Sequence, residues 1–260
     1  MMQLVILAGG KGTRISEESY LKPKPLIEIG GMPIIWHLMK IYSYHGINEF
    51  IICGGYKCNL IKDFFSNYIF HKSDIEIDIF KNKIKKISNF KLNWKIIIAD
   101  TGLETQTGGR LKRIQKYLKG NHFCMTYGDG LSDINIKKLI SFHRSHKKLA
   151  TVTAIQPVGK FGAINIVNNN VINFREKPKG DGQWINGGFF VLNKKIFSYI
   201  DNDQTIWERQ PLEKLSQNNE LKAFKHNGFW QSMDTLNDKN TLEKIWSDQT
   251  KRPPWKKWND

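Results

Sequence analysis

The chain has 260 residues, of which 40% are hydrophobic and 12% aromatic, so it is long enough to bury the core of one or two domains. Polar residues interrupt every isoleucine-rich run and the first three residues carry no basic side chain, which argues against a membrane span or a signal peptide and predicts a soluble, cytoplasmic protein. The formal charge of +16 suits anionic partners, although a chain this rich in lysine, isoleucine and asparagine gains charge without any binding surface.

Short apolar runs alternate with segments of helical periodicity through the first half of the chain. The apolar runs predict strands at 3–7, 50–53, 95–99 and 122–126, and the periodic segments predict helices at 33–46, 58–67 and 109–118. This alternation is typical of a doubly wound, mainly parallel α/β sheet, whose ligands bind beyond the carboxyl ends of the strands. Two glycine-rich segments, 9–12 and 128–130, follow predicted strands and therefore mark the expected site.

The second half of the chain changes character. Strand-like segments at 151–156, 163–166, 171–174 and 188–192 are joined by glycine, asparagine and proline, which predicts a mixed sheet region over the cleft. A helix is predicted at 238–246. The tail, 251–260, contains two prolines and two tryptophans, so we expect it to dock on the surface of the protein.

The glycine-rich segment Gly9-Gly10-Lys11-Gly12-Thr13-Arg14 follows the first predicted strand. Glycines remove the side chains that would keep a polyphosphate away from backbone N–H groups, so this segment is a candidate triphosphate cradle; the alternative is an ordinary turn. It matches neither a Walker A motif nor a dinucleotide fingerprint. Ten residues after Arg14, the segment Lys22-Pro23-Lys24-Pro25 presents Lys24 between two stiffening prolines, which suits a charge placed on a phosphoryl group.

This motif and its spacing resemble those of the sugar-nucleotide pyrophosphorylases, which are nucleotidyltransferases. The resemblance extends along the chain and is strongest to the glucose-1-phosphate cytidylyltransferase branch. The blocks that carry it are Ser16-Glu17-Glu18, Thr107-Gly108-Gly109-Arg110-Leu111-Lys112-Arg113, Tyr127-Gly128-Asp129-Gly130, Glu176-Lys177-Pro178-Lys179-Gly180-Asp181-Gly182, Ile185-Asn186-Gly187-Gly188-Phe189-Phe190 and Phe229-Trp230-Gln231-Ser232-Met233-Asp234-Thr235.

The resemblance implies a Rossmann-like sheet of the glycosyltransferase-A type, carried by a single nucleotidyltransferase domain at 1–250. The nucleotide part would span about 1–135, the sugar-phosphate part about 136–235, and the tail 251–260. The implied reaction joins CTP to glucose 1-phosphate and releases pyrophosphate, for the synthesis of deoxysugars and surface polysaccharides. A homo-oligomer is also expected.

Asp129 and Asp234 are implied as the ligands of Mg²⁺, which prefers carboxylate and phosphate oxygens. Taken alone, an aspartate between two glycines is an ordinary turn residue. Arg14 and Lys24 are the expected catalytic cations on the triphosphate. The expected nucleotide-binding residues are Leu7, Ala8, Gly9, Gly10, Gly12, Thr13, Arg14, Lys24, Thr107, Arg110 and Gly128.

Arg110 is the candidate donor to the base, because cytosine presents an acceptor at N3 where uracil presents a donor. The alternative is that Arg110 belongs only to the basic face of an exposed helix. For the sugar phosphate, the resemblance implies Lys177 on the phosphate, with Glu176, Asn186 and Gly187 at the hydroxyl groups. Lys160 stands where the family pattern has arginine, which keeps the charge and loses a two-pronged contact.

Three other functions remain open on the sequence. The chain could transfer a cytidylyl or uridylyl group to another sugar phosphate or phosphorylated metabolite, or it could bind a nucleotide sugar without turnover. Charge alone suggests a nucleic-acid partner; we expect none, because the densest basic run, 81–86, is typical of a solvated loop or edge strand. The three cysteines have no zinc-ligand spacing and are predicted to be reduced.

Overall fold

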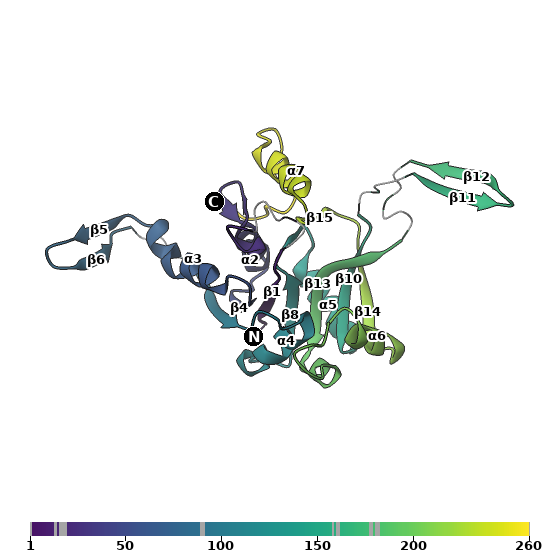
Figure 1. The fold of residues 1–260 in the computed structure, drawn as a ribbon, viewed down its shortest axis with the longest axis horizontal. Coiled ribbons are helices and arrows are strands. Elements are labelled where there is room, and N and C mark those ends of the chain that lie inside the picture. The colour runs from purple at the N-terminus through teal and green to yellow at the C-terminus, as the bar shows by residue number, and fades with distance from the viewer. Residues whose placement is uncertain are drawn as a thin grey trace.

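A seven-stranded sheet forms the centre of the protein, with the strand order β14-β10-β13-β8-β1-β4-β7 (Figure 1). The computed structural model describes residues 2–12, 15, 20–88, 92–157, 159, 162–176, 179 and 183–259. The strands of the sheet are β1 (Leu4–Ala8), β4 (Glu49–Gly54), β7 (Lys95–Asp100), β8 (His122–Tyr127), β10 (Ala150–Ile155), β13 (Ile185–Asn193) and β14 (Leu221–His226). Strands β8, β1, β4 and β7 run parallel, and β10 runs parallel to β14, whereas β13 is antiparallel to both of its neighbours.

Strand β1 is an interior strand of the sheet, and every one of its residues is buried. Its side chains alternate between two apolar clusters, with Leu4 and Ile6 in one and Val5 and Leu7 in the other. A strand that buries both faces needs helices on both sides of the sheet, which is the doubly wound arrangement that the sequence predicts.

Six α-helices surround this sheet in the described part of the chain. They are α2 (Ile34–Tyr44), α3 (Cys58–His71), α4 (Thr107–Ile114), α5 (Ile136–His146), α6 (Gln210–Gln217) and α7 (Leu236–Ser247). Side chains of α2 and α5 belong to the cluster of Leu4 and Ile6, and side chains of α4 and α6 belong to the cluster of Val5 and Leu7. Short 3₁₀-helices span Lys24–Leu26, Gln115–Tyr117 and Lys194–Tyr199.

Four two-stranded sheets complete the fold. They are β2 (Glu28–Ile29) with β3 (Met32–Pro33), β5 (Ile75–Asp78) with β6 (Lys83–Lys86), β9 (Gly130–Ser132) with β15 (Trp230–Ser232), and β11 (Ala163–Val167) with β12 (Asn170–Arg175). The β5–β6 and β11–β12 hairpins project from opposite ends of the molecule (Figure 1) and are called the first arm and the second arm below.

The predicted strands and helices of the first half are confirmed, with shifts at their ends. The helix predicted at 109–118 begins at Thr107 and passes into a 3₁₀ turn after Ile114. The helix predicted at 238–246 begins at Leu236, because Thr235 and Asp238 form a reciprocal capping box. That signature, a threonine followed three residues later by an acid, is visible in the sequence.

The second half forms the expected mixed sheet, and the start of β13 lines the cleft. Strands β10 and β13 extend the central sheet, and only β11 and β12 form a separate hairpin, which projects from the body as the second arm. Periodicity shows that a segment is extended but does not show which strand it pairs with, so the sequence predicted the segments and left their pairing open.

The tail docks as predicted, because Trp255 and Trp258 are buried in the same apolar cluster as α2. All three cysteines are free and buried. The basic run at 81–86 contributes exposed strand β6 of the first arm. Within the described ranges, no helix combines the length and the apolar character needed to cross a membrane.

Candidate active site

A cleft of about 710 Å³ opens at the carboxyl ends of the parallel strands. The segments that follow β1, β7 and β8 line it, together with the start of β13 and the segment from β15 to α7. Ligands of open α/β sheets bind at this edge because several loops leave the sheet there and can converge on one ligand.

The glycine-rich segment after β1 lies in this cleft. A Cβ added to Gly9 would approach the Arg110 guanidinium to within 2.3 Å, whereas a Cβ on Gly10 would meet nothing within 4 Å. Gly9 is therefore required by the packing of the cleft wall, and Gly10 leaves open space in which a phosphate can reach the backbone.

Asp129 and Asp234 come from opposite halves of the chain, and strand pairing brings them together. In the antiparallel β9–β15 pair, Gly130 is opposite Ser232, and the Met233 N–H donates to the Asp129 carbonyl over 2.8 Å. Each aspartate lies at the end of one of these short strands, so their side chains reach the same point of the cleft. The sequence-based expectation that these carboxylates converge is met.

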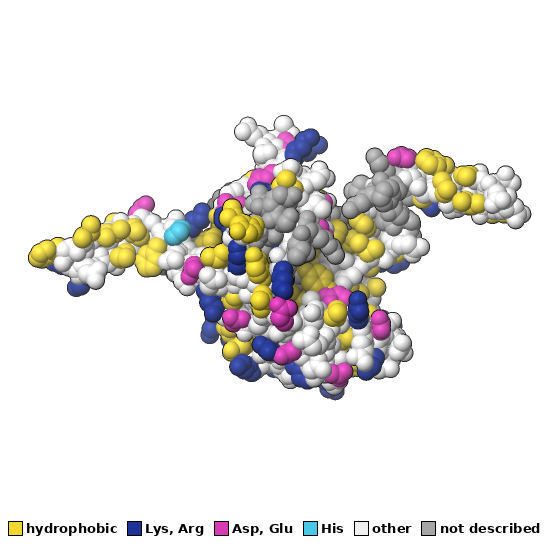
Figure 2. All heavy atoms as spheres, viewed as in Figure 1, with side chains coloured by type: hydrophobic (Ala, Val, Ile, Leu, Met, Phe, Trp, Pro, Cys, Tyr) yellow, Lys and Arg dark blue, Asp and Glu magenta, His cyan; other side chains and the backbone are white. Residues whose placement is uncertain are grey.

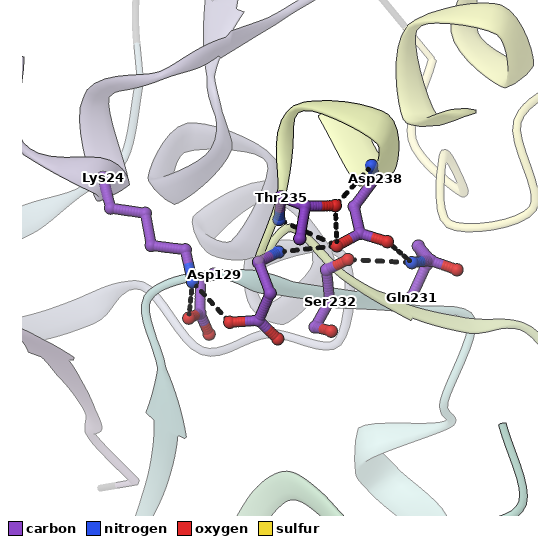
Figure 3. Close-up of polar contacts among 7 residues, drawn as sticks. Lys24, Asp129, Gln231, Ser232, Thr235 and Asp238 are labelled. Carbon is purple, nitrogen blue, oxygen red and sulfur yellow. Dashed lines mark hydrogen bonds and ion pairs between the residues drawn. The ribbon is translucent and has the colours of Figure 1, made fainter. Parts of the chain in front are cut away.

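Lys24 connects the two carboxylates. Its Nζ atom lies 2.6 Å from Asp129 Oδ2 and 2.9 Å from Asp234 Oδ1, and its side chain is only 13% exposed (Figure 3). Burial would lower the pKa of Lys24, but the charges and hydrogen bonds of the two aspartates outweigh burial and raise that pKa above 10.5. Lys24 is therefore charged at neutral pH and offsets the repulsion between the two carboxylates.

The loop that carries Asp234 is itself fixed by Asp238, at the start of α7 (Figure 3). Asp238 Oδ2 accepts hydrogen bonds from the backbone N–H groups of Asp234 (3.1 Å) and Thr235 (2.9 Å), and Asp238 Oδ1 accepts one from the Gln231 side chain. The Asp238 carboxylate thus fixes the backbone from which the Asp234 carboxylate extends into the cleft.

Arg110 lies on the first turns of α4, with its side chain buried in the cleft wall. Its Nη1 and Nη2 atoms lie between 2.7 and 3.3 Å from the carbonyl oxygens of four residues and the hydroxyl of Thr101. The four carbonyls belong to Gly9, Gly54, Gly102 and Leu103, which end or follow β1, β4 and β7. Burial lowers the pKa of Arg110, and no carboxylate in the described residues forms an ion pair with it.

This geometry bears on both sequence-based interpretations of Arg110. The alternative of a merely exposed basic helix face is wrong, because Arg110 is buried and lines the cleft. Its terminal N–H groups point to protein oxygens, so direct donation to a base stays a prediction. What the structure establishes is that Arg110 ties three loops of the cleft wall together.

Thr107 and Tyr127 line the cleft, and each is hydrogen-bonded to a residue of the second half of the chain. Thr107 Oγ1 donates to Glu208 Oε2 over 2.6 Å, and Asn186 Nδ2 donates to the Tyr127 hydroxyl over 3.2 Å. Burial, followed by the charge of Glu208 and a hydrogen bond to it, raises the pKa of Tyr127 well above 10, so its hydroxyl stays protonated.

Comparison with known proteins decides the family. A sequence model described as nucleotidyl transferase matches residues 3–248. The chain belongs to the nucleotidyltransferase family. This nucleotidyltransferase is 53% identical over 258 residues to proteins named glucose-1-phosphate cytidylyltransferase from Salmonella typhi and Salmonella typhimurium, and each alignment covers 99% of the chain and 100% of the relative.

Solved structures support the same fold. The crystal structure of HddC from Yersinia pseudotuberculosis has a TM-score of 0.70 at 24% identity, and the match covers 95% of this nucleotidyltransferase and 100% of HddC. The predicted enzyme class and the predicted fold class are both confirmed.

Most of the predicted site residues that the structure describes line this one cleft. They are Leu7, Ala8, Gly9, Gly10, Gly12, Lys24, Thr107, Arg110, Gly128, Asp129, Asn186, Gly187 and Asp234. Glu176 is an exception, because it follows β12 at the base of the second arm, outside the residues that line the cleft. Thr13, Arg14 and Lys177, as well as Lys160, lie outside the described residues, so their roles stay predictions.

Sequence reasoning missed several residues of the nucleotidyltransferase cleft. The loop Leu103–Gln106, after β7, lines it, and Lys11 and Glu104 join that loop to the glycine-rich segment by an ion pair of 2.9 Å. The rule that ligands bind beyond strand ends would have indicated this loop. Trp230 also lines the cleft, with its indole N–H donating to the Gly187 carbonyl over 2.7 Å.

Proposed function

We propose that this enzyme makes CDP-glucose and pyrophosphate from CTP and glucose 1-phosphate. The observation that carries the proposal is the convergence of the glycine-rich segment, Lys24, Asp129 and Asp234 in one cleft. The choice of substrates is supported by the 53% identity to the Salmonella relatives over nearly the whole chain.

The chemistry of the reactants explains why such a cleft suffices. A sugar phosphate is an anion at neutral pH, so its oxygen can attack the α-phosphorus without a general base, and pyrophosphate leaves in line. The protein must therefore position two polyanions and offset their repulsion. Lys24 and the backbone N–H groups of the glycine-rich segment suit the triphosphate, and Arg14 and Lys177 are proposed to add charge on the two reactants.

We propose Mg²⁺ as the cofactor, held by Asp129 and Asp234. The fit rests on two carboxylates that reach one point of a phosphate-binding cleft. No group of three or more potential ligands among His, Cys, Asp and Glu exists within the described residues, so phosphate oxygens and water would complete the coordination, as is usual for Mg²⁺. When bound, the ion would neutralise charge on the triphosphate and on the leaving pyrophosphate.

A direct assay tests the proposed reaction. The protein is incubated with Mg²⁺ and each pair drawn from CTP or UTP and a panel of sugar 1-phosphates, and pyrophosphate and the nucleotide sugar are measured. We expect the highest kcat/KM for CTP with glucose 1-phosphate. A higher value for another pair would reassign the substrates, and no turnover with any pair would leave a nucleotide-sugar binding protein.

We also propose a cytoplasmic homo-oligomer that supplies CDP-glucose for deoxysugar and surface-polysaccharide synthesis. Both arms expose apolar side chains (Figure 2), including Ile79 and Phe80 at 88% and 95% exposure. An isolated two-stranded hairpin is marginally stable in water, so a second copy of the chain is proposed to cover the arms. Light scattering checks this, and a mass of 30.2 kDa in solution, that of one chain, would contradict it.

A further inference from the structure

The Lys24 ammonium lies where a divalent cation would bind. It contacts one oxygen of Asp129 and one of Asp234, at 2.6 and 2.9 Å (Figure 3). Those aspartate side chains are 29% and 35% exposed, so the cleft gives access to the pair while Lys24 itself is almost covered. The protein therefore carries its own cation between the two proposed metal ligands.

An ammonium and a Mg²⁺ ion cannot occupy this point together. Mg²⁺ binds carboxylate oxygens at about 2.0–2.1 Å, closer than the roughly 2.7–2.9 Å of a charged N–H···O bond. An ion placed on both oxygens would lie almost against Nζ, and the repulsion between the two positive charges is strong in a partly buried site. Lys24 has to leave before the ion can bind these two oxygens together.

The glycine-rich segment, where the triphosphate is proposed to bind, lines the same cleft as Lys24. A phosphate bound there would give the Lys24 ammonium a new partner. The four-carbon stem of Lys24 is flexible and its ammonium binds phosphate as readily as carboxylate. A bound triphosphate would present such phosphates and would also bring the ion.

We propose that Lys24 holds the place of the divalent cation in the nucleotide-free enzyme and moves to the triphosphate when the ion arrives. The proposal rests on the metal site of the proposed function. It makes uptake of the ion and of the nucleotide positively coupled, since each removes the obstacle to the other. The free enzyme should accordingly bind a divalent ion weakly, although both ligands are already in place.

Titration with Mn²⁺, followed by electron paramagnetic resonance without nucleotide, tests the exchange. We expect Lys24→Met to bind Mn²⁺ about tenfold or more tightly than the wild type, because the two carboxylates lose their resident cation. Mg²⁺ should also raise the melting temperature of Lys24→Met more than that of the wild type.

Lys22→Met is the matched control. Lys22 lies two residues away and pairs with Glu28 over 2.6 Å, with both side chains about half exposed, and it does not line the cleft. This variant should bind Mn²⁺ like the wild type. A comparable gain in Lys22→Met would show that the loss of any positive charge suffices and would overturn the exchange.

Two further outcomes separate this proposal from the proposed function. Equal Mn²⁺ affinity of the wild type and Lys24→Met would overturn the exchange, while turnover by the wild type would leave the proposed reaction standing. If Asp129→Asn does not abolish the tight binding gained by Lys24→Met, the ion binds elsewhere, and both the exchange and the assigned metal ligands fail.

Discussion

Lys24 and Arg110 are two cationic side chains that line the same cleft, the first largely covered and the second buried, and the protein holds them in different ways. Lys24 lies between two carboxylates, whereas Arg110 lies against backbone carbonyls and the Thr101 hydroxyl. The partners of Lys24 are charges that another cation can take over. The partners of Arg110 are neutral oxygens fixed by three strand ends, which no ligand replaces.

This difference separates two roles for positive charge in one cleft. A lysine paired with carboxylates can exchange its place during the reaction, because both charges find other partners when substrate binds. An arginine that binds several backbone acceptors is part of the cleft wall, because moving it would take the donor from the Gly102 and Leu103 carbonyls and one of the donors from the Gly9 and Gly54 carbonyls. The contrast predicts that changes near Lys24 act mainly on turnover, and that changes to Arg110 act first on stability.

The largest effect on turnover is expected for the two aspartates that contact Lys24, Asp129 and Asp234. Asp129→Asn and Asp234→Asn should fold normally and lose turnover by about a hundredfold to a thousandfold, because each removes a charged ligand at the point of phosphoryl transfer. Steady-state assays with matched circular dichroism spectra check this. Asp133→Asn is the control, since Asp133 pairs with His226 outside the cleft; full activity in either active-site variant would refute the metal assignment.

The second prediction concerns Arg110 and the part of the cleft wall that it holds together. Arg110→Met should lower the free energy of unfolding by about 2 kcal/mol, because the Gly102 and Leu103 carbonyls lose their donor and the buried Gly9 and Gly54 carbonyls lose one of theirs. Urea denaturation measures the change. Arg113→Met, three residues away, removes an arginine whose ion pair with Asp203 is about half exposed, so a much smaller change is expected. Equal losses of stability in Arg110→Met and Arg113→Met would contradict the role of Arg110 in the cleft wall, and with it the contrast to Lys24.

The sequence could predict Lys24 and the two aspartates better than it could predict Arg110. Lys24 is set between prolines in a motif of fixed spacing, and Asp129 follows a buried strand, so local pattern and resemblance suffice. The role of Arg110 in the wall depends on where Gly9, Gly54 and Gly102 meet in space, and no periodicity reports that meeting point.

The same limit applies to strand pairing. Apolar runs predicted β1, β4, β7 and β8 because a strand buried on both faces has a strong local pattern. The β9–β15 pair, which brings the aspartates together, joins two three-residue strands about a hundred residues apart. Such short strands have no period to detect, and long-range packing decides their partners.

The smallest effect on turnover is expected at Asp238, which fixes the backbone beside Asp234. Asp238→Asn should lower kcat by about tenfold, with little change in KM for the nucleotide, because Asp238 Oδ2 fixes the backbone N–H groups of Asp234 and Thr235. Asn135→Ala is the matched control. It removes the side chain that caps α5, whose Oδ1 atom accepts a hydrogen bond of 3.0 Å from the Lys138 N–H, and Asn135 does not line the cleft. Both variants should lose about 1 kcal/mol of stability, as caps usually contribute, and only Asp238→Asn should lose turnover. Equal kcat values in the two variants would reduce Asp238 to a helix cap, and the placement of Asp234 would then depend on the β9–β15 pairing alone.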